Sequence, residues 1–141
     1  VPPYLLFTSA TRSMFTGTAE MGQQIAQFYV HYNGGQLDEI TYFFQRTNYN
    51  EFNTLRQIER MRIEARNQNY PEYYEGLAKF LRSYLFYQLT LRVGDIPYSE
   101  ALKAMDGVSQ PKYDSQKDVF LGILRELEEA NDLIPASGTI V

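Results

Sequence analysis

The feature that most constrains the fold is the segment from Pro71 to Arg92, whose apolar side chains spread over more than one face of a helix. These side chains are Tyr73, Tyr74, Leu77, Phe80, Leu81, Tyr84, Leu85, Tyr87, Leu89 and Leu91. A helix that is apolar nearly all round is buried between neighbouring elements. We therefore predict that this segment is the central core helix and that its tyrosines lie mostly in the core.

Three other segments repeat apolar residues every three or four positions, which is the spacing of an amphipathic helix. They cover about residues 3–32, 51–68 and 114–134. Gly17 is a position where the first helix can bend or break, and Asn33-Gly34-Gly35 is expected to end it. In the last segment, Ser115-x-x-Asp118 resembles a capping box and Pro135 ends the helix. No segment alternates like a strand, so the predicted class is all-α.

Long helices separated by short breaks are typical of stacked helical hairpins. The sequence shows no self-similarity at the period of about 34 residues that marks tetratricopeptide repeats, so any such repeats are degenerate. The chain has 141 residues, and we predict one α-helical domain over residues 1–141. Residues 36–50 are the least periodic stretch, and we interpret them as a loop.

The composition excludes several kinds of site. The chain has no cysteine and a single histidine, His31, so disulfides, thiolate metal sites and two-histidine metal sites cannot form within it. The sequence contains no glycine-rich phosphate motif, and no pair of carboxylates is singled out for acid–base chemistry. We predict no catalytic residue, no metal site and no cofactor. The net charge is −4 and the basic residues are scattered, so no nucleic-acid partner is expected.

The stretch RVGDIPYSEAL, residues 92–102, marks a change in chain direction. Gly94 is placed to take the left-handed conformation after the central helix, and Ile96 is biased to an extended conformation because it precedes proline. Asp95 is expected to bond backbone amides in the turn, and Ser99 to cap a short helix over residues 100–103. We interpret the stretch as a rigid corner rather than as an active site or a phosphate cradle.

Ligand-binding candidates lie in the irregular loop. Tyrosine, which occurs 12 times, combines an apolar ring with a hydroxyl and so suits sugar faces and amphipathic peptides. Binding groups concentrate on loops that a rigid scaffold positions. The candidates are therefore Tyr42, Arg46, Asn48 and Tyr49.

Two sequence motifs and their separation point to a known family. The first is Gly94-Asp95-Ile96-Pro97-Tyr98-Ser99-Glu100-Ala101-Leu102, and the second is Pro111-Lys112-Tyr113-Asp114-Ser115-Gln116, followed by Ile123-Leu124-x-x-Leu127-x-x-Ala130. This combination resembles the SusD/RagB family of outer-membrane nutrient-binding lipoproteins, particularly its starch-binding-associated branch. The resemblance marks Gly94, Asp95, Pro97, Tyr98, Pro111, Tyr113 and Asp114 as structural motif residues. Val93 stands where the family usually carries a large aromatic residue.

The resemblance implies degenerate tetratricopeptide-like hairpins forming the N-terminal helical portion of a larger protein, without its signal sequence and lipidated cysteine. It implies non-enzymatic capture of glycans or other nutrients on the cell outer membrane, beside a TonB-dependent barrel transporter of the SusC type. The alternative is a helical scaffold that binds only proteins. If the rest of the fold is missing, the apolar stripe of residues 119–134 lacks its cover, so we expect an exposed apolar patch or self-association.

Overall fold

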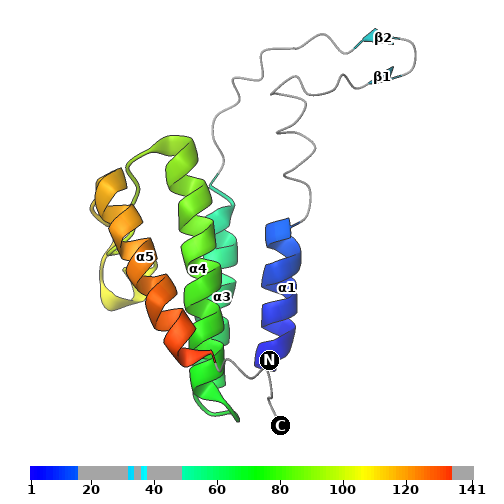
Figure 1. The fold of residues 1–141 in the computed structure, drawn as a ribbon, viewed down its shortest axis with the longest axis vertical. Helices are drawn as coiled ribbons and strands as arrows, with labels where there is room; N and C mark the ends of the chain where they lie inside the picture. Colours follow the sequence, from blue (N-terminus) through cyan, green and yellow to red (C-terminus); the bar gives the residue numbers. More distant parts are fainter. Residues whose placement is uncertain (16–31, 34–35, 38–48, 135–141) are drawn as a thin grey trace. The chain divides into compact units, whose positions relative to one another are not determined.

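The computed structural model of the protein describes residues 1–15, 32–33, 36–37 and 49–134. The chain divides into two compact units, residues 1–14 with 49–141 and residues 15–48. Figure 1 shows the described helices, which are α1 (Pro3–Phe15), α3 (Glu51–Ala65), α4 (Pro71–Val93), the 3-10 helix η1 (Lys103–Asp106) and α5 (Gln116–Leu133). Helices α3, α4 and α5 pack each against the next, which confirms the predicted all-α class and its stacked hairpins.

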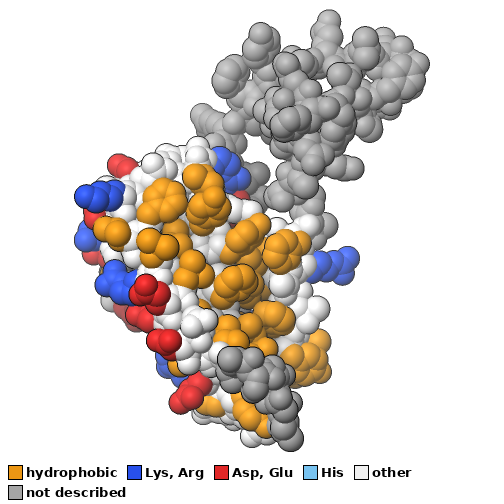
Figure 2. All heavy atoms as spheres, viewed as in Figure 1, with side chains coloured by type: hydrophobic (Ala, Val, Ile, Leu, Met, Phe, Trp, Pro, Cys, Tyr) orange, Lys and Arg blue, Asp and Glu red, His pale blue; other side chains and the backbone are white. Residues whose placement is uncertain are grey.

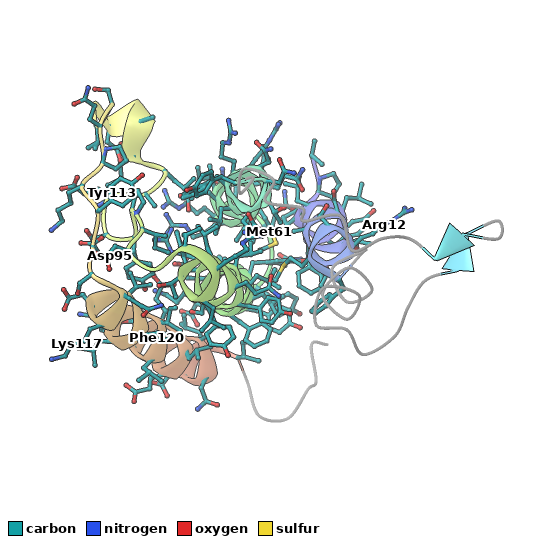
Figure 3. The ribbon with its side chains drawn as sticks, turned by 90° about the horizontal axis from the view of Figure 1, so that it is seen from above. Arg12, Met61, Asp95, Tyr113, Lys117 and Phe120 are labelled. Atoms are coloured by element: carbon teal, nitrogen blue, oxygen red, sulfur yellow. The ribbon has the colours of Figure 1, made fainter. Side chains whose placement is uncertain are left out.

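The core forms around α4, which lies between α3 and α5 (Figure 3). Phe86 and Leu89 of α4 are completely buried, in one apolar cluster with Leu55 of α3 and Val119 of α5. Helix α1 contributes Ala10 and Met14 to the same cluster. The central position predicted for residues 71–92 is therefore confirmed.

Helices α4 and α5 approach closely because a glycine removes a side chain from their interface. A Cβ atom at Gly76 of α4 would lie 2.8 Å from Cγ1 of Ile134 and 3.3 Å from the carbonyl oxygen of Ala130. Such distances leave no room for a methyl group at this position. The ion pair between Lys79 and Glu129, with a distance of 2.7 Å, lies across the same pair of helices.

The start of α5 follows the sequence expectation. Ser115 has the extended conformation of an N-cap residue, and its hydroxyl accepts a hydrogen bond from the amide of Asp118 at 3.2 Å. The hydroxyl also donates to the Asp118 carboxylate at 2.7 Å. The predicted N-cap is thus present, but the second bond of a capping box is replaced, because the Asp118 carboxylate accepts the hydroxyl of Ser115 and not its backbone amide.

Of the segment predicted as helix over residues 3–32, the structure describes α1 over Pro3–Phe15, and residues 16–31 lie outside the described residues. Gly17, where the helix was expected to bend or break, is one of these residues, so the bend stays a prediction. Within the second unit, β1 (Tyr32–Asn33) pairs antiparallel with β2 (Gln36–Leu37), so the predicted helix at Tyr32 and loop at residues 36–37 are wrong. The physical reason lies in the Gly34-Gly35 pair, because such pairs favour the two-residue turns of hairpins over a helix end.

The tyrosines of α4 lie nearer the surface than predicted. Tyr73, Tyr74 and Tyr84 are only partly buried, and Tyr87 is exposed. The reason is that α3 and α5 cover two sides of α4 and, within the described residues, leave much of a third side open. The prediction that these tyrosines lie mostly in the core is therefore wrong for Tyr87.

An exposed apolar surface runs along this open side. We call it the α4–α5 apolar face, and it consists of Phe80, Tyr87, Leu91, Phe120, Leu124 and Leu127. The rings of Tyr87 and Phe120 lie 6.2 Å apart and connect the two helices across the face. Leu124 belongs to the apolar stripe of residues 119–134 and is 58% exposed. Figure 2 shows hydrophobic side chains gathered over these helices, so the expected exposed patch is present.

We predict that residues 1–141 bind an environment-sensitive apolar dye or self-associate in solution, because a large contiguous apolar surface favours both. The variant Leu124→Gln should reduce dye fluorescence and the oligomer fraction in sedimentation velocity. Glu128→Gln, at an exposed position on the same helix, is the control and should change neither. A monomeric sedimentation profile without dye binding would contradict the prediction.

Candidate functional site

The two sequence motifs meet in space at a corner between α4 and α5. Ile96 and Asp114 pair as an isolated antiparallel bridge, with the Ile96 amide 3.3 Å from the Asp114 carbonyl oxygen and the reverse bond at 3.0 Å. Ile96 is almost completely buried, and its extended conformation agrees with its position before Pro97. Figure 3 shows the corner, with Asp95 and Tyr113 labelled, beside the start of α5.

The Asp114 carboxylate organises one side of this corner. It accepts hydrogen bonds from the amides of Tyr98 at 3.1 Å and Ser99 at 2.7 Å, and from the Ser99 hydroxyl at 3.0 Å. Burial alone would raise the pKa of Asp114, but the bonds from Ser99 and Tyr98 to the charged form outweigh it, so the pKa is lowered. The carboxylate therefore acts as a fixed, charged acceptor.

The Asp95 carboxylate holds the other side. It accepts the backbone amide of Gln116, the first residue of α5, at 2.9 Å. The first amides of a helix have no partner inside the helix, and the positive end of the helix dipole favours a carboxylate there. The expectation that Asp95 bonds amides within its own turn is therefore wrong, because its partner lies at the start of the next helix.

The end of α4 is joined to the same point. The amide of Gly94 donates to the Thr90 carbonyl oxygen at 2.8 Å, and the Thr90 hydroxyl donates to the Gly94 carbonyl oxygen at 2.7 Å. Gln116 reaches back from α5 and donates its side-chain amide to the Thr90 carbonyl oxygen at 2.8 Å. Gly94 has φ of 81° and ψ of −119°, so the expected positive φ is present, although ψ lies outside the left-handed helical region.

Ser99 does not start a helix. Residues 99–102 form turns, and the short helix η1 begins only at Lys103. The Ser99 hydroxyl, which was expected to cap a helix over residues 100–103, donates to Asp114 instead. The Ser99 amide also donates to Asp114, so the residue is held at the corner and the chain continues as a turn.

Tyr98 packs the corner onto the core. Its ring lies 5.0 Å from the ring of Phe86 in an edge-to-face arrangement, and the Arg82 guanidinium lies 4.8 Å from the Phe86 ring and 5.6 Å from that of Tyr98. Arg82 also donates to the Tyr98 carbonyl oxygen and pairs with Glu126 at 3.1 Å. Burial and the nearby Glu126 carboxylate raise the pKa of Tyr98, so its phenol stays neutral and is no base.

The remaining motif residues contribute less to this network. Pro97 and Pro111 are partly buried, and the Lys112 amide donates to the Glu100 carboxylate at 3.0 Å. The Tyr113 side chain is 70% exposed. The structure thus brings Gly94, Asp95, Tyr98 and Asp114 together around one corner and leaves the Tyr113 ring outside it.

Of the four ligand-binding candidates in the irregular loop, one lies among the described residues. Tyr42, Arg46 and Asn48 lie outside the described residues, as does His31. Tyr49 is described; it is exposed, and its ring lies 6.4 Å from that of Phe52 near the start of α3. A ligand-binding role for these four loop residues stays a prediction.

A charged cavity of about 270 Å³ lies between α3, α4, α5 and η1. Its Arg62 is paired with Glu59 at 2.6 Å and with Glu75 at 3.2 Å, which links α3 to α4. Across the described ranges, no three histidine, cysteine or acidic side chains are grouped as a metal ion would require. We interpret the cavity as the site of ion pairs that hold the helices together, and not as a reaction centre.

A second cavity, of about 250 Å³, opens where the start of α1 meets the turn between α3 and α4. Four tyrosines from these segments line it, together with two prolines and the amide side chains Gln68 and Asn69. Sequence reasoning missed this cavity. Its only signal is the tyrosine cluster at residues 70–74, and periodicity assigned most of that cluster to the core.

Comparisons with known proteins agree on one family. Residues 1–140 match the SusD-like family described as "Starch-binding associating with outer membrane". A solved SusD homologue from Bacteroides fragilis is 37% identical with a TM-score of 0.80, and a second from the same species is 28% identical with a TM-score of 0.78. A Bacteroides vulgatus structure, a candidate outer membrane protein with a suggested role in nutrient binding, is 37% identical with a TM-score of 0.79. No curated protein matched.

The match covers the whole chain but only part of these relatives. The alignments with the first B. fragilis structure and with the B. vulgatus structure each cover 100% of this chain and 30% of the relative. The alignment with the second B. fragilis structure covers 94% of this chain and 29% of that relative. This chain therefore spans less than a third of the relatives' length. Among the helices of the described ranges, none is long and apolar enough to span a membrane.

We predict that Asp114→Asn lowers the free energy of unfolding by about 1.5–3 kcal/mol at neutral pH, because it removes the charge from an acceptor of three hydrogen bonds. The folded-state pKa of Asp114 is below its ordinary value of 3.8, so its stabilisation is complete above that pH and is lost as the pH falls below it. The difference between wild type and variant in urea unfolding should shrink accordingly. Asp132→Asn, at an exposed position of α5, is the control.

We predict that Gly122→Ala destabilises the fold, because its Cβ would lie 2.8 Å from Cζ and 2.9 Å from the hydroxyl of Tyr98. Overpacking costs about 1–3 kcal/mol, whereas alanine gains about 1 kcal/mol in helix propensity. Thermal unfolding followed by circular dichroism measures the net loss. In a Tyr98→Leu background the same substitution should cost less, and an equal cost in both backgrounds would contradict the packing argument.

Proposed function

This chain belongs to the SusD-like family of starch-binding proteins that associate with the outer membrane, and from this premise we propose that it forms part of a nutrient-capture protein. The protein binds glycans or related nutrients without transforming them and passes them to a TonB-dependent barrel transporter. It acts at the outer surface as a lipoprotein, anchored through a lipidated cysteine that residues 1–141 do not contain.

The observation that carries the proposal is the family match over residues 1–140, which includes both motif segments of the corner. The chemistry of the described residues is consistent with binding. Asp95 and Asp114 accept backbone amides, and burial helps to keep the Tyr98 phenol neutral, so these three groups serve the structure of the corner. Such an arrangement stiffens a scaffold that presents ligands and does not transform them.

A protein-binding scaffold without small-ligand binding is the second candidate, and the α4–α5 apolar face favours it. Leu91, Leu124 and Leu127 offer carbon atoms to a partner but no hydrogen-bonding groups. Surfaces of this kind are typical of protein–protein contacts. The scaffold hypothesis therefore predicts a protein partner and no soluble ligand.

The two candidates are separated by testing the full-length protein. We expect titration calorimetry with soluble oligosaccharides to detect binding, and we expect a barrel transporter to co-purify from outer membranes. Unchanged oligosaccharide after prolonged incubation would agree with binding alone. Co-purification of a protein partner without binding of any glycan would favour the scaffold, and hydrolysis that a single carboxylate substitution abolishes would overturn both.

A further inference from the structure

We propose that the second cavity, which we call the tyrosine groove, is a subsite for one or two rings of a neutral sugar; this inference rests on the proposed function. The groove has a volume of about 250 Å³, and its lining combines Tyr4 of α1 with Tyr70, Tyr73 and Tyr74 at the start of α4. Pockets for drug-sized ligands measure about 300–1,000 Å³, so this groove suits a shorter ligand segment.

The exposed tyrosine rings provide the first argument. Tyr4 is 58% exposed and Tyr70 is 49% exposed, while the rings of Tyr73 and Tyr74 lie 5.9 Å apart, edge to face. The carbon-bound hydrogens of a sugar ring form an apolar face that packs against an aromatic ring, and each phenol adds a hydrogen-bonding group. The lining thus offers several apolar surfaces with polar tips in a small volume.

The charge of the lining provides the second argument. All eight lining residues are uncharged, whereas the cavity between α3, α4, α5 and η1 is lined by several ion-paired side chains. Gln68 and Asn69 bring amide groups that both donate and accept hydrogen bonds, as sugar hydroxyls do. A phosphate or a carboxylate would find no cation in this lining. The lining therefore favours a neutral, hydroxyl-rich ligand.

The backbone of Tyr70 provides the third argument. Tyr70 has φ of 64° and ψ of 50°, a left-handed conformation that is unfavourable for a residue with a large side chain. Two other positions with positive φ, residues 94 and 107, carry glycine, and Leu102 packs its side chain against the core. Tyr70 instead exposes about half of its side chain at the groove. An unfavourable backbone conformation at an exposed aromatic residue is typical of functional sites, so it supports a ligand-binding role for the Tyr70 ring.

The test uses the full-length protein and a variant that separates strain from binding. Tyr70→Asn removes the ring but keeps a residue that tolerates the left-handed conformation. We expect this variant to have an unchanged or higher melting temperature and an affinity for maltohexaose that is about tenfold lower. Tyr4→Ala should weaken the same binding. Tyr113→Asn, which removes an exposed ring outside the groove, is the matched control and should leave the affinity unchanged.

Hydrogen–deuterium exchange locates the effect in a protein that has further binding surfaces. We expect maltohexaose to protect backbone amides of residues 66–75 in the wild type, and we expect Tyr70→Asn to abolish that protection. If the wild type binds maltohexaose but protection and affinity are unchanged in the groove variants, the groove is refuted and the proposed function stands. If neither maltohexaose nor any other oligosaccharide of a neutral glycan panel binds, the groove is refuted together with the capture of neutral glycans by this protein.

Discussion

The fold depends on two carboxylates that hold the corner between α4 and α5. The segment from Gly94 to Ser115 contains little regular structure of its own, so its buried amides need partners from elsewhere in the chain. Asp114 supplies them for Tyr98 and Ser99, and Asp95 supplies one for the first amide of α5. Each carboxylate joins residues far apart in sequence, and together they fix where α5 begins relative to the end of α4. Close packing requires that position to be fixed, because Gly76 of α4 lies directly against the end of α5, and Gly122 of α5 lies directly against the Tyr98 ring of the corner.

The helices could be predicted from the sequence because their apolar residues recur at the helical period, and the α5 cap could be predicted because Ser115 and Asp118 are three residues apart. The partners of Asp95 and Ser99 could not, because hydrogen bonds between distant residues leave no local pattern. The exposure of Tyr87 was missed for a related reason. Periodicity identifies apolar faces, but it does not say whether another element covers each of them.

The candidate sites show the same limit. The corner motif could be recognised as structural from its glycine and prolines, since these residues restrict the backbone in known ways. The tyrosine groove could not be recognised, because Tyr4 lies in α1 and Tyr70 lies just before α4, and the two meet only when α1 packs beside the turn between α3 and α4. The sequence also gives no sign that Tyr70 takes a positive φ, since a tyrosine before Pro71 is ordinarily extended.

Helix α4 supplies surface residues of two kinds along its length, and this division bears on the choice between a sugar and a protein as partner. Tyr73, Phe80, Tyr87 and Leu91 are spaced by seven, seven and four positions, so they lie on one side of the helix. At the amino-terminal end, neighbouring tyrosines and amide side chains provide hydrogen bonds that a sugar requires. At the carboxy-terminal end, Leu91 and the leucines of α5 provide none, and burying sugar hydroxyls against them would cost free energy. A glycan and a protein partner can therefore occupy different ends of one helix, so that evidence for a protein contact on the apolar face would not argue against sugar binding in the groove.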